Sequence, residues 1–203
     1  MRLILATRNP GKVAELAARL SDLGIEPVSA SGVSGAPEVD EDRETLHGNA
    51  EKKARALYDH TGEPSLADDT GLEVDALGGA PGVHSARYAG PEADDAANRQ
   101  RLLAALDATE QRSARFRTVL AYADASGVTF FDGVCEGAIT REQSGDGGFG
   151  YDSIFVPADA DGRTFAAMEA DEKNRISHRG RALDAFVVWL QTTRQRPEDG
   201  QGA

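Results

Sequence analysis

The sequence has a single cysteine, Cys135, and no apolar run of the length needed to cross a bilayer. One cysteine excludes an internal disulfide framework, which fits the reducing conditions of the cytoplasm. The opening segment, Met1–Leu5, is too short for a signal peptide and is followed by polar residues. We therefore expect a cytoplasmic protein with no membrane partner.

Positive charge is also scarce. The chain has 22 Lys and Arg residues against 34 Asp and Glu residues, which gives a net charge of −12. Binding to the backbone of DNA or RNA needs a basic surface, so we expect no nucleic-acid polymer as a partner. A small anionic ligand remains compatible with this charge, because a few local cations, or a metal held by carboxylates, would bind it.

Zinc ligands and a serine nucleophile are missing as well. His47, His60 and His84 have no Cys or His partner at the spacing of zinc ligands, and no Gly-x-Ser-x-Gly motif is present. These absences disfavour a zinc enzyme and a serine hydrolase of the nucleophile-elbow type.

Strand-like and helix-like segments alternate along the 203 residues. We expect helices from 11 to about 23, over 45–60 and 94–106, and from 177 onward, and strands over 2–6, 25–30, 65–67, 72–77, 115–123, 128–139 and 151–156. The hairpin at 115–139 favours an α/β domain with a mixed sheet over a purely parallel one. Without an internal repeat or a linker, residues 1–196 are predicted to form one domain, and residues 197–203 a disordered tail.

The stretch ATRNPGK places two cations, Arg8 and Lys12, where a helix is predicted to start. The dipole of a helix start prefers an acid, and its free backbone N–H groups attract anions. Pro10 suits the first helical turn, and Gly11 permits close approach of a ligand to the backbone. This turn is therefore a candidate phosphate site, although an ordinary turn with solvated cations fits the residues equally well.

The same charge pattern recurs near the end of the chain, in EKNRISHRGRAL. Ser177 is a natural N-cap, and it is followed by His178 and Arg179 in the first helical turn, with Lys173 close before it. Two helix starts with misplaced cations suggest electron-rich ligand atoms at both places. The alternative is an ordinary surface patch.

The segment LADDTGLEVD contains adjacent carboxylates, Asp68 and Asp69, after a short apolar strand. Adjacent side chains point in different directions, so one would bind a metal or activate water while the other orients a cation. Asp and Thr are also common turn residues, which is the alternative. The run Asp40-Glu41-Asp42 lies in a long polar loop, and one of the three would complete a magnesium site if this loop folds back.

A glycine-dense segment, SGDGGFGYDSIF, carries aromatic residues beside an acid. Phe149 and Tyr151 would stack on a base, and Asp152 would accept a hydrogen bond from a ring N–H. A glycine-rich hairpin with core aromatics explains the same residues.

Five motifs occur together and in order, namely ATRNPGKVAEL, NAEKKA, ADDTGLEVDALGGAPGVHSARYAG, GGFGYDSIF and EKNRISHRGRAL. Together they resemble the non-canonical purine nucleoside triphosphate pyrophosphatases, which act on dITP, ITP and XTP. The resemblance implies a homodimeric, Mg²⁺-dependent, cytosolic enzyme that hydrolyses the α–β phosphoanhydride to a nucleoside monophosphate and pyrophosphate. It also implies an elongated two-lobed α/β fold, with a long mixed sheet flanked by helices and the active site in a cleft between the lobes.

The resemblance assigns roles to individual residues. Asp69 would be the proton acceptor and a metal ligand, and Glu41 would be the other metal ligand, although Asp40 and Asp42 match that loosely similar loop equally well. Thr7, Asn9, Lys12 and Lys53 would hold the triphosphate. The remaining substrate-binding residues, the later ones around the base, would be Thr70, Phe149, Gly150, Tyr151, Asp152, Lys173, His178 and Arg179.

Base recognition would then follow from charge. Arg179, with His178 as a second candidate, would donate to the O6 carbonyl that hypoxanthine and xanthine carry and adenine lacks. Leaving such buried donors unpaired gives discrimination of about 10⁴-fold. Two rival functions remain at this point: a pyrophosphatase for modified pyrimidine nucleotides, and a non-catalytic nucleotide sensor.

Overall fold

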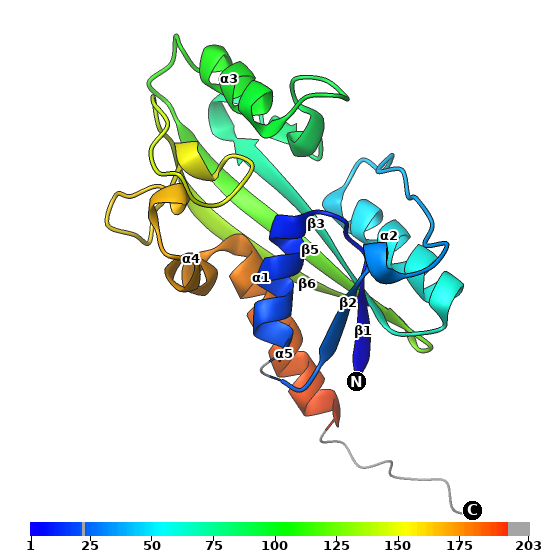
Figure 1. Ribbon diagram of the computed structural model, residues 1–203. Coiled ribbons are helices and arrows are strands. Elements are labelled where there is room, and N and C mark those ends of the chain that lie inside the picture. The colour runs from blue at the N-terminus through cyan, green and yellow to red at the C-terminus, as the bar shows by residue number, and fades with distance from the viewer. Residues whose placement is uncertain (22, 195–203) are drawn as a thin grey trace, which may run out of the picture.

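The centre of the molecule is a seven-stranded mixed sheet, seen in a computed structural model that describes residues 1–21 and 23–194 (Figure 1). The strand order is β2-β1-β3-β5-β6-β7, with β4 paired to the far end of β3. Strand β1 pairs in parallel with β2 and β3, whereas β3, β5, β6 and β7 follow one another in antiparallel pairs. The strands are β1 (Arg2–Leu5), β2 (Glu26–Ser29), β3 (Ser65–Val74), β4 (Pro81–Gly82), β5 (Ser113–Asp124), β6 (Gly127–Ile139) and β7 (Phe155–Pro157).

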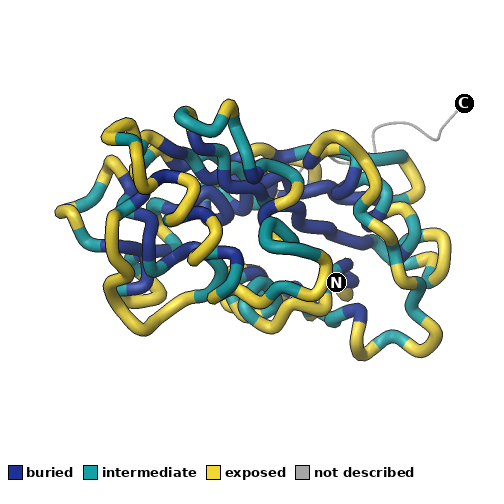
Figure 2. Tube along the Cα trace, turned by 90° about the horizontal axis from the view of Figure 1, so that it is seen from above, coloured by how far each residue is buried: buried dark blue, intermediate teal, exposed yellow. Residues whose placement is uncertain are grey.

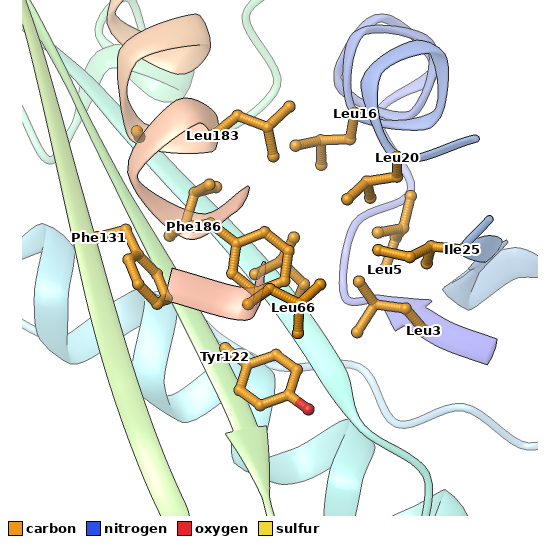
Figure 3. Close-up of a cluster of buried hydrophobic side chains, with 13 residues drawn as sticks. Leu3, Leu5, Leu16, Leu20, Ile25, Leu66, Tyr122, Phe131, Leu183 and Phe186 are labelled. Carbon is orange, nitrogen blue, oxygen red and sulfur yellow. The ribbon is translucent and has the colours of Figure 1, made fainter. Parts of the chain in front are cut away.

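Helices cover both faces of this sheet, and the described residues form five of them in all. They are α1 (Pro10–Ser21), α2 (Leu46–Thr61), α3 (Asp95–Ala105), α4 (Ala170–Ile176) and α5 (His178–Arg194). Helices α1 and α5 share one apolar cluster with the sheet, built around Leu16, Leu66 and Phe186 (Figure 3). Helix α2 packs on the opposite face through Leu46, Ala50, Ala54 and Leu57, against Ala67, Val119 and Ala121.

A third cluster lies at the far end of β3, β5 and β6, where Phe116 packs edge-on to Phe155 with ring centroids 4.7 Å apart. Helix α3 and the segment around β7 gather at this end, whereas β1, β2 and α2 lie at the other (Figure 1). Figure 2 shows exposed loops surrounding a buried centre that extends along the molecule. The expected elongated two-lobed α/β domain with a long mixed sheet flanked by helices is therefore confirmed. The tail predicted at 197–203 lies outside the described residues.

The expected end of a strand at Ala67 is wrong, because β3 continues through Asp68, Asp69, Thr70 and Gly71 to Val74. Asp and Gly have low strand propensity, which opposes a strand in this segment, but contacts with other parts of the chain outweigh that preference. Both carboxylates are bound by cations, and the Thr70 hydroxyl lies 2.7 Å from that of Thr118 on β5. A Cβ at Gly71 would lie 2.7 Å from the Gly82 carbonyl oxygen, so this position has no room for a side chain.

Two other expectations need correction. The strand predicted over 151–156 is a 3₁₀ turn, Asp152–Ile154, followed by the short strand β7. Helix α4 was not expected, because its seven residues are too few to show a helical period. The other expected helices and strands are present, with ends that shift by a few residues.

Among the described residues, no helix is both long and apolar enough to cross a membrane.

Gly133 allows α5 to approach β6 closely. A Cβ at this position would lie 2.0 Å from the His178 carbonyl oxygen and 2.5 Å from the Ala182 nitrogen. We expect Gly133→Ala to lower the free energy of unfolding by about 1–3 kcal/mol, because the start of α5 must move away. Urea unfolding would measure the change. Gly32→Ala is the control, since its Cβ would meet only Val28 at an ordinary 3.7 Å, and an equally stable Gly133 variant would contradict the account.

Candidate functional site

Two adjoining cavities open where the strand pairing of β3 is interrupted. Strand β1 pairs with β3 only as far as Leu66, and β4 begins to pair at Leu72. Between these points the edge of β3 has no neighbouring strand, so the Asp68 carbonyl oxygen accepts a hydrogen bond from the Lys53 ammonium at 2.8 Å instead. The gap in pairing thus brings lysine side chains to the middle of the sheet.

The larger cavity has a volume of about 330 Å³ and the smaller one about 110 Å³. The larger is lined by polar groups that include Thr7, Arg8, Asn9, Lys12, Glu41, Lys53, Asp69 and Thr70. The smaller is lined by a more apolar set that includes Phe116, Phe149, Gly150, Tyr151, Asp152, Lys173, His178 and Arg179. Asn9, Lys12, Thr70 and Ala86 line both. The structure therefore brings together almost all of the predicted site residues, in two chemically different compartments.

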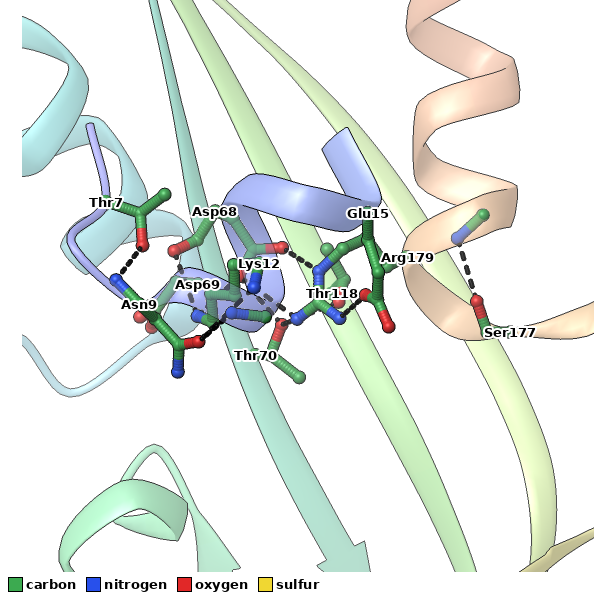
Figure 4. Close-up of polar contacts among 12 residues, drawn as sticks. Thr7, Asn9, Lys12, Glu15, Asp68, Asp69, Thr70, Thr118, Ser177 and Arg179 are labelled. Atoms are coloured by element: carbon green, nitrogen blue, oxygen red, sulfur yellow. Dashed lines mark hydrogen bonds and ion pairs between the residues drawn. The ribbon is translucent and has the colours of Figure 1, made fainter. Parts of the chain in front are cut away.

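The start of α1 is capped by its own sequence. Asn9 Oδ1 accepts hydrogen bonds from the backbone N–H groups of Gly11 at 2.9 Å and Lys12 at 3.3 Å, and Thr7 Oγ1 accepts one from the Asn9 N–H (Figure 4). Pro10 has no N–H group. The free backbone donors expected here are thus largely occupied, and the cationic side chain of Lys12 is the main attraction for an anion.

Arg8, Pro10 and Gly11 of this turn have surroundings that differ from those expected of a phosphate site. Arg8 lines the larger cavity, but its guanidinium is paired with Glu38 at 3.1 Å. Pro10 and Gly11 are not among the residues that line either cavity. Gly11 instead makes room for an aromatic ring, because a Cβ there would lie 2.5 Å from Phe149 Cδ1. Its close contact is with the glycine-dense loop across the cleft.

Glu41 and Asp69 share a cation at the larger cavity. Lys53 Nζ lies 2.6 Å from Glu41 Oε1 and 2.7 Å from Asp69 Oδ1. Burial and the negative charge of Glu41 raise the pKa of Asp69 to about 6, although Lys53 acts in the opposite direction. Burial would also raise the pKa of Glu41, but Lys53 holds it below its ordinary value. Two carboxylates are thus crowded against one ammonium.

This pair fits a magnesium ion. Mg²⁺ is usually held by one or two carboxylates plus substrate phosphates, and no group of three or more His, Cys, Asp or Glu residues at metal-binding spacing occurs in the described part of the chain. Asp40 and Asp42 do not line the cavity, and the Asp42 carboxylate is paired with Lys52 at 2.9 Å. The geometry therefore places Glu41, rather than its two acidic neighbours, beside Asp69.

Sequence reasoning missed two residues that support these groups. Arg87 donates a hydrogen bond to the Glu41 carbonyl oxygen at 2.8 Å and so ties the acidic loop to the 3₁₀ turn Ser85–Arg87. Glu15, one turn after Lys12 on α1, accepts hydrogen bonds from Lys173 at 2.8 Å and Arg179 at 2.5 Å. Both lie inside the recognised motifs, but nothing in their spacing indicated these contacts.

Arg179 is almost saturated by acceptors of the protein itself. Its Nε donates to Asp68 Oδ2 at 2.7 Å, and its two terminal nitrogens donate to Glu15 and to Thr70 Oγ1 (Figure 4). Burial would raise the pKa of Asp68, but Arg179 and Lys12 hold it far below its usual range. Asp68 is therefore ionised and binds cations, whereas Asp69 faces Lys53 on the other side of the strand.

The smaller cavity is shaped by the glycine-dense loop. Asp152 Oδ2 accepts hydrogen bonds from Lys173 at 2.7 Å and from the Phe149 N–H at 2.9 Å. The Tyr151 hydroxyl donates to the Ser85 carbonyl oxygen. Tyr151 and Asp152 therefore have partners within the protein, and Phe149 is the ring placed between α1 and the cations, with Lys173 Nζ 5.0 Å from its centroid.

His178 is buried at the first turn of α5 and stacks on Phe116, with ring centroids 4.4 Å apart. Its Nδ1 atom is buried without a hydrogen-bond partner among the described residues. Burial, together with the charges of Arg179 and Lys173, lowers the pKa of His178 well below its ordinary value. The imidazole is therefore neutral, and its buried Nδ1 is a polar atom without a partner among the described residues of a side chain that lines the smaller cavity.

Comparisons with known proteins agree over nearly the whole chain. A family model described as the Ham1 family matches residues 3–189. A dITP/XTP pyrophosphatase of Syntrophobacter fumaroxidans is 52% identical and is matched over 93% of this chain and 84% of its own. One of Desulforamulus reducens is also 52% identical, over 90% of this chain and 92% of its own.

Solved structures show the same similarity. A HAM1 protein from Coxiella burnetii has a TM-score of 0.86 and 41% identity, and the match covers 95% of this chain and 99% of that one. A nucleoside-triphosphatase, also named dITP/XTP pyrophosphatase, from Mycobacterium abscessus has a TM-score of 0.74 and 44% identity, over 92% and 99% of the two chains.

The buried neutral state of His178 has a consequence for stability. The unfolded imidazole takes up a proton below its ordinary pKa of about 6.5, so stability present above this pH is lost as the pH falls. Between about pH 7.5 and about pH 5.5 we expect the wild type to lose about 1 kcal/mol more of its free energy of unfolding than His178→Phe, which keeps the stacking on Phe116. Urea unfolding at both pH values would measure it, and equal losses would contradict a buried neutral imidazole.

Proposed function

This chain belongs to the Ham1 family, and from that premise we propose that it hydrolyses non-canonical purine nucleoside triphosphates such as dITP, ITP and XTP. The scissile bond is the α–β phosphoanhydride, and the products are the nucleoside monophosphate and pyrophosphate. The observation that supports this function is the pairing of the two cavities: the larger one is lined by cations and two carboxylates, and the smaller one by aromatic rings and the imidazole of His178.

The larger cavity suits the triphosphate. Lys12 and Lys53 supply positive charge, and Asn9 and Thr7 supply polar side chains at its wall. Asp69, with its pKa raised to about 6, is ionised at neutral pH but is a stronger base than an ordinary carboxylate. It would take the proton from the water that attacks phosphorus, while the lysines compensate the charge on the departing pyrophosphate.

We include Mg²⁺ in the proposal. Glu41 and Asp69 would hold the ion, because their carboxylates converge on one cation at the wall of the phosphate cavity. When bound, the ion would neutralise phosphate charge, a task that Lys53 shares. Lys53 keeps the two carboxylates together. Desolvation by burial lowers the pKa of Lys53, but the charges of Asp69 and Glu41 raise it above its ordinary value and so favour the ammonium.

The smaller cavity suits a purine with an oxo group at position 6. Arg179 has most of its N–H groups occupied by Asp68, Glu15 and Thr70, so it is a weaker candidate for the O6 contact than the sequence suggested. His178 lines the same cavity, and its buried Nδ1 has no partner among the described residues. With its proton on Nδ1, the neutral imidazole would donate to the O6 carbonyl and would oppose the amino group of adenine.

Homodimer formation and a cytoplasmic location complete the proposal. The resemblance in sequence supports the dimer, and light scattering of the purified protein would test it. The buried thiol of Cys135, whose pKa burial raises to about 11, fits a reducing compartment where no disulfide is needed.

A nucleotide panel tests the function directly. ITP, XTP, dITP, ATP, GTP, dUTP and modified pyrimidine triphosphates would be incubated with the protein, with and without Mg²⁺, and scored separately for pyrophosphate and orthophosphate. Preferential release of pyrophosphate from ITP, XTP and dITP supports the proposal. Preference for the pyrimidine nucleotides would favour the first rival function, and the absence of turnover would favour a sensor.

Asp69→Asn removes the proposed base with little change in shape. We expect kcat for ITP to fall by at least about 10²-fold while the fold and ITP binding persist. Circular dichroism, calorimetric binding of ITP and release of pyrophosphate would check these three points. Asp132→Asn, an exposed change on β6, serves as the control. Substantial turnover by Asp69→Asn would show that another group activates the water.

A further inference from the structure

Asp68 lies between the two cavities but lines neither of them. It is 1% exposed, in the middle of β3. A substrate in the cavities therefore does not touch this carboxylate, and any effect of Asp68 on the reaction must pass through the groups that it holds.

Its partners come from three elements. Oδ1 lies 2.5 Å from Lys12 Nζ of α1 and accepts a hydrogen bond from Thr70 Oγ1 at 3.0 Å. Oδ2 accepts one from Arg179 Nε of α5 at 2.7 Å. Lys12 lines both cavities, whereas Arg179 lines the smaller one and not the larger. Arg179 Nη2 also donates to Oδ1, at 3.4 Å. One carboxylate thus binds both Lys12, which lines the phosphate cavity, and Arg179, which lines the base cavity, and its Oδ1 contacts both cations.

Electrostatics restricts how far these charged groups can move relative to one another. Two cations gathered in a poorly solvated interior repel each other, and the shared carboxylate between them offsets that repulsion. A displacement of Arg179 by a base with the wrong edge would pull on Oδ2, and the rigid carboxylate would carry the change to Lys12 at Oδ1. Glu15 holds Arg179 from the other side, so the guanidinium has little freedom to adjust alone.

We propose that Asp68 is a positioning residue that fixes Lys12 and Arg179 relative to each other, so that the fit of the base sets the rate of phosphate cleavage. The inference rests on the proposed function and deepens it: discrimination between bases is expressed in kcat as well as in KM. When a correct base is bound, Lys12 stays where it compensates the charge on the departing pyrophosphate. An incorrect base displaces Lys12 from this position.

Asp68→Asn, assayed in steady state on ITP and ATP, tests this role. The amide keeps the shape but holds the two cations poorly, so we expect kcat for ITP to fall by about 10–100-fold and the ITP-to-ATP ratio of kcat to fall by at least about tenfold. Asp132→Asn, a matched control on β6, should change neither value. An equal loss of kcat on both nucleotides, or a change confined to KM, would overturn the proposal.

Pyrophosphate binding gives a second test that needs neither turnover nor the loss of a buried charge. Arg179→Lys keeps the cation but loses the guanidinium bond to Asp68. We expect it to weaken calorimetric binding of pyrophosphate by at least about threefold, although Arg179 does not line the larger cavity, the proposed phosphate site. Arg181→Lys is the control on the same helix, where the arginine contacts Val134 and Asp159. Unchanged affinity in Arg179→Lys, or no binding to the wild type, would overturn the inference.

Failure of the wild type to cleave ITP would overturn the proposed function, and this binding experiment would still decide the role of Asp68.

Discussion

The alternation of side chains along β3 is the constraint from which the site follows. Adjacent residues of a strand face opposite sides of the sheet, so Asp68 faces the layer of α1 and α5, and Asp69 faces the layer of α2. Each carboxylate therefore finds cations from a different helix layer: Lys12 and Arg179 for the first, and Lys53 for the second. Neither carboxylate could be buried without these partners, because an unpaired buried charge is very costly.

The interrupted pairing of β3 converts this charged centre into a cleft. Strand β1 ends early and β4 begins late, so the edge of β3 between them is open to side chains and to a ligand. The polar cavity lies against this edge beside α2, and the more apolar cavity lies toward the glycine-dense loop and α5. A triphosphate and a purine need surroundings that differ in this way. The residues that line both cavities, Asn9, Lys12, Thr70 and Ala86, lie at the boundary between them.

Much of the fold could be predicted from the sequence because its signals are local. Helical periods and caps indicated α1, α2, α3 and α5, and alternation indicated the hairpin of β5 and β6. The continuation of β3 through Asp68–Gly71 could not be predicted, since polar residues and glycine usually end a strand. Pairing with β5 and cations from distant parts of the chain stabilise this segment. The same limit explains Glu15 and Arg87, whose partners lie far away in the chain.

By itself, the sequence determined the family, the two groups of cations at helix starts and the pair of neighbouring acids, because residue types and motifs are properties of the chain alone. Only the tertiary structure decided which acid binds which cation, and that Glu41 rather than Asp40 or Asp42 reaches the cavity. It also decided that Arg179 is occupied, while the buried Nδ1 of His178 has no partner among the described residues. These choices depend on distances between segments that are remote in sequence, and such distances are set by how the helices pack on the two faces of the sheet.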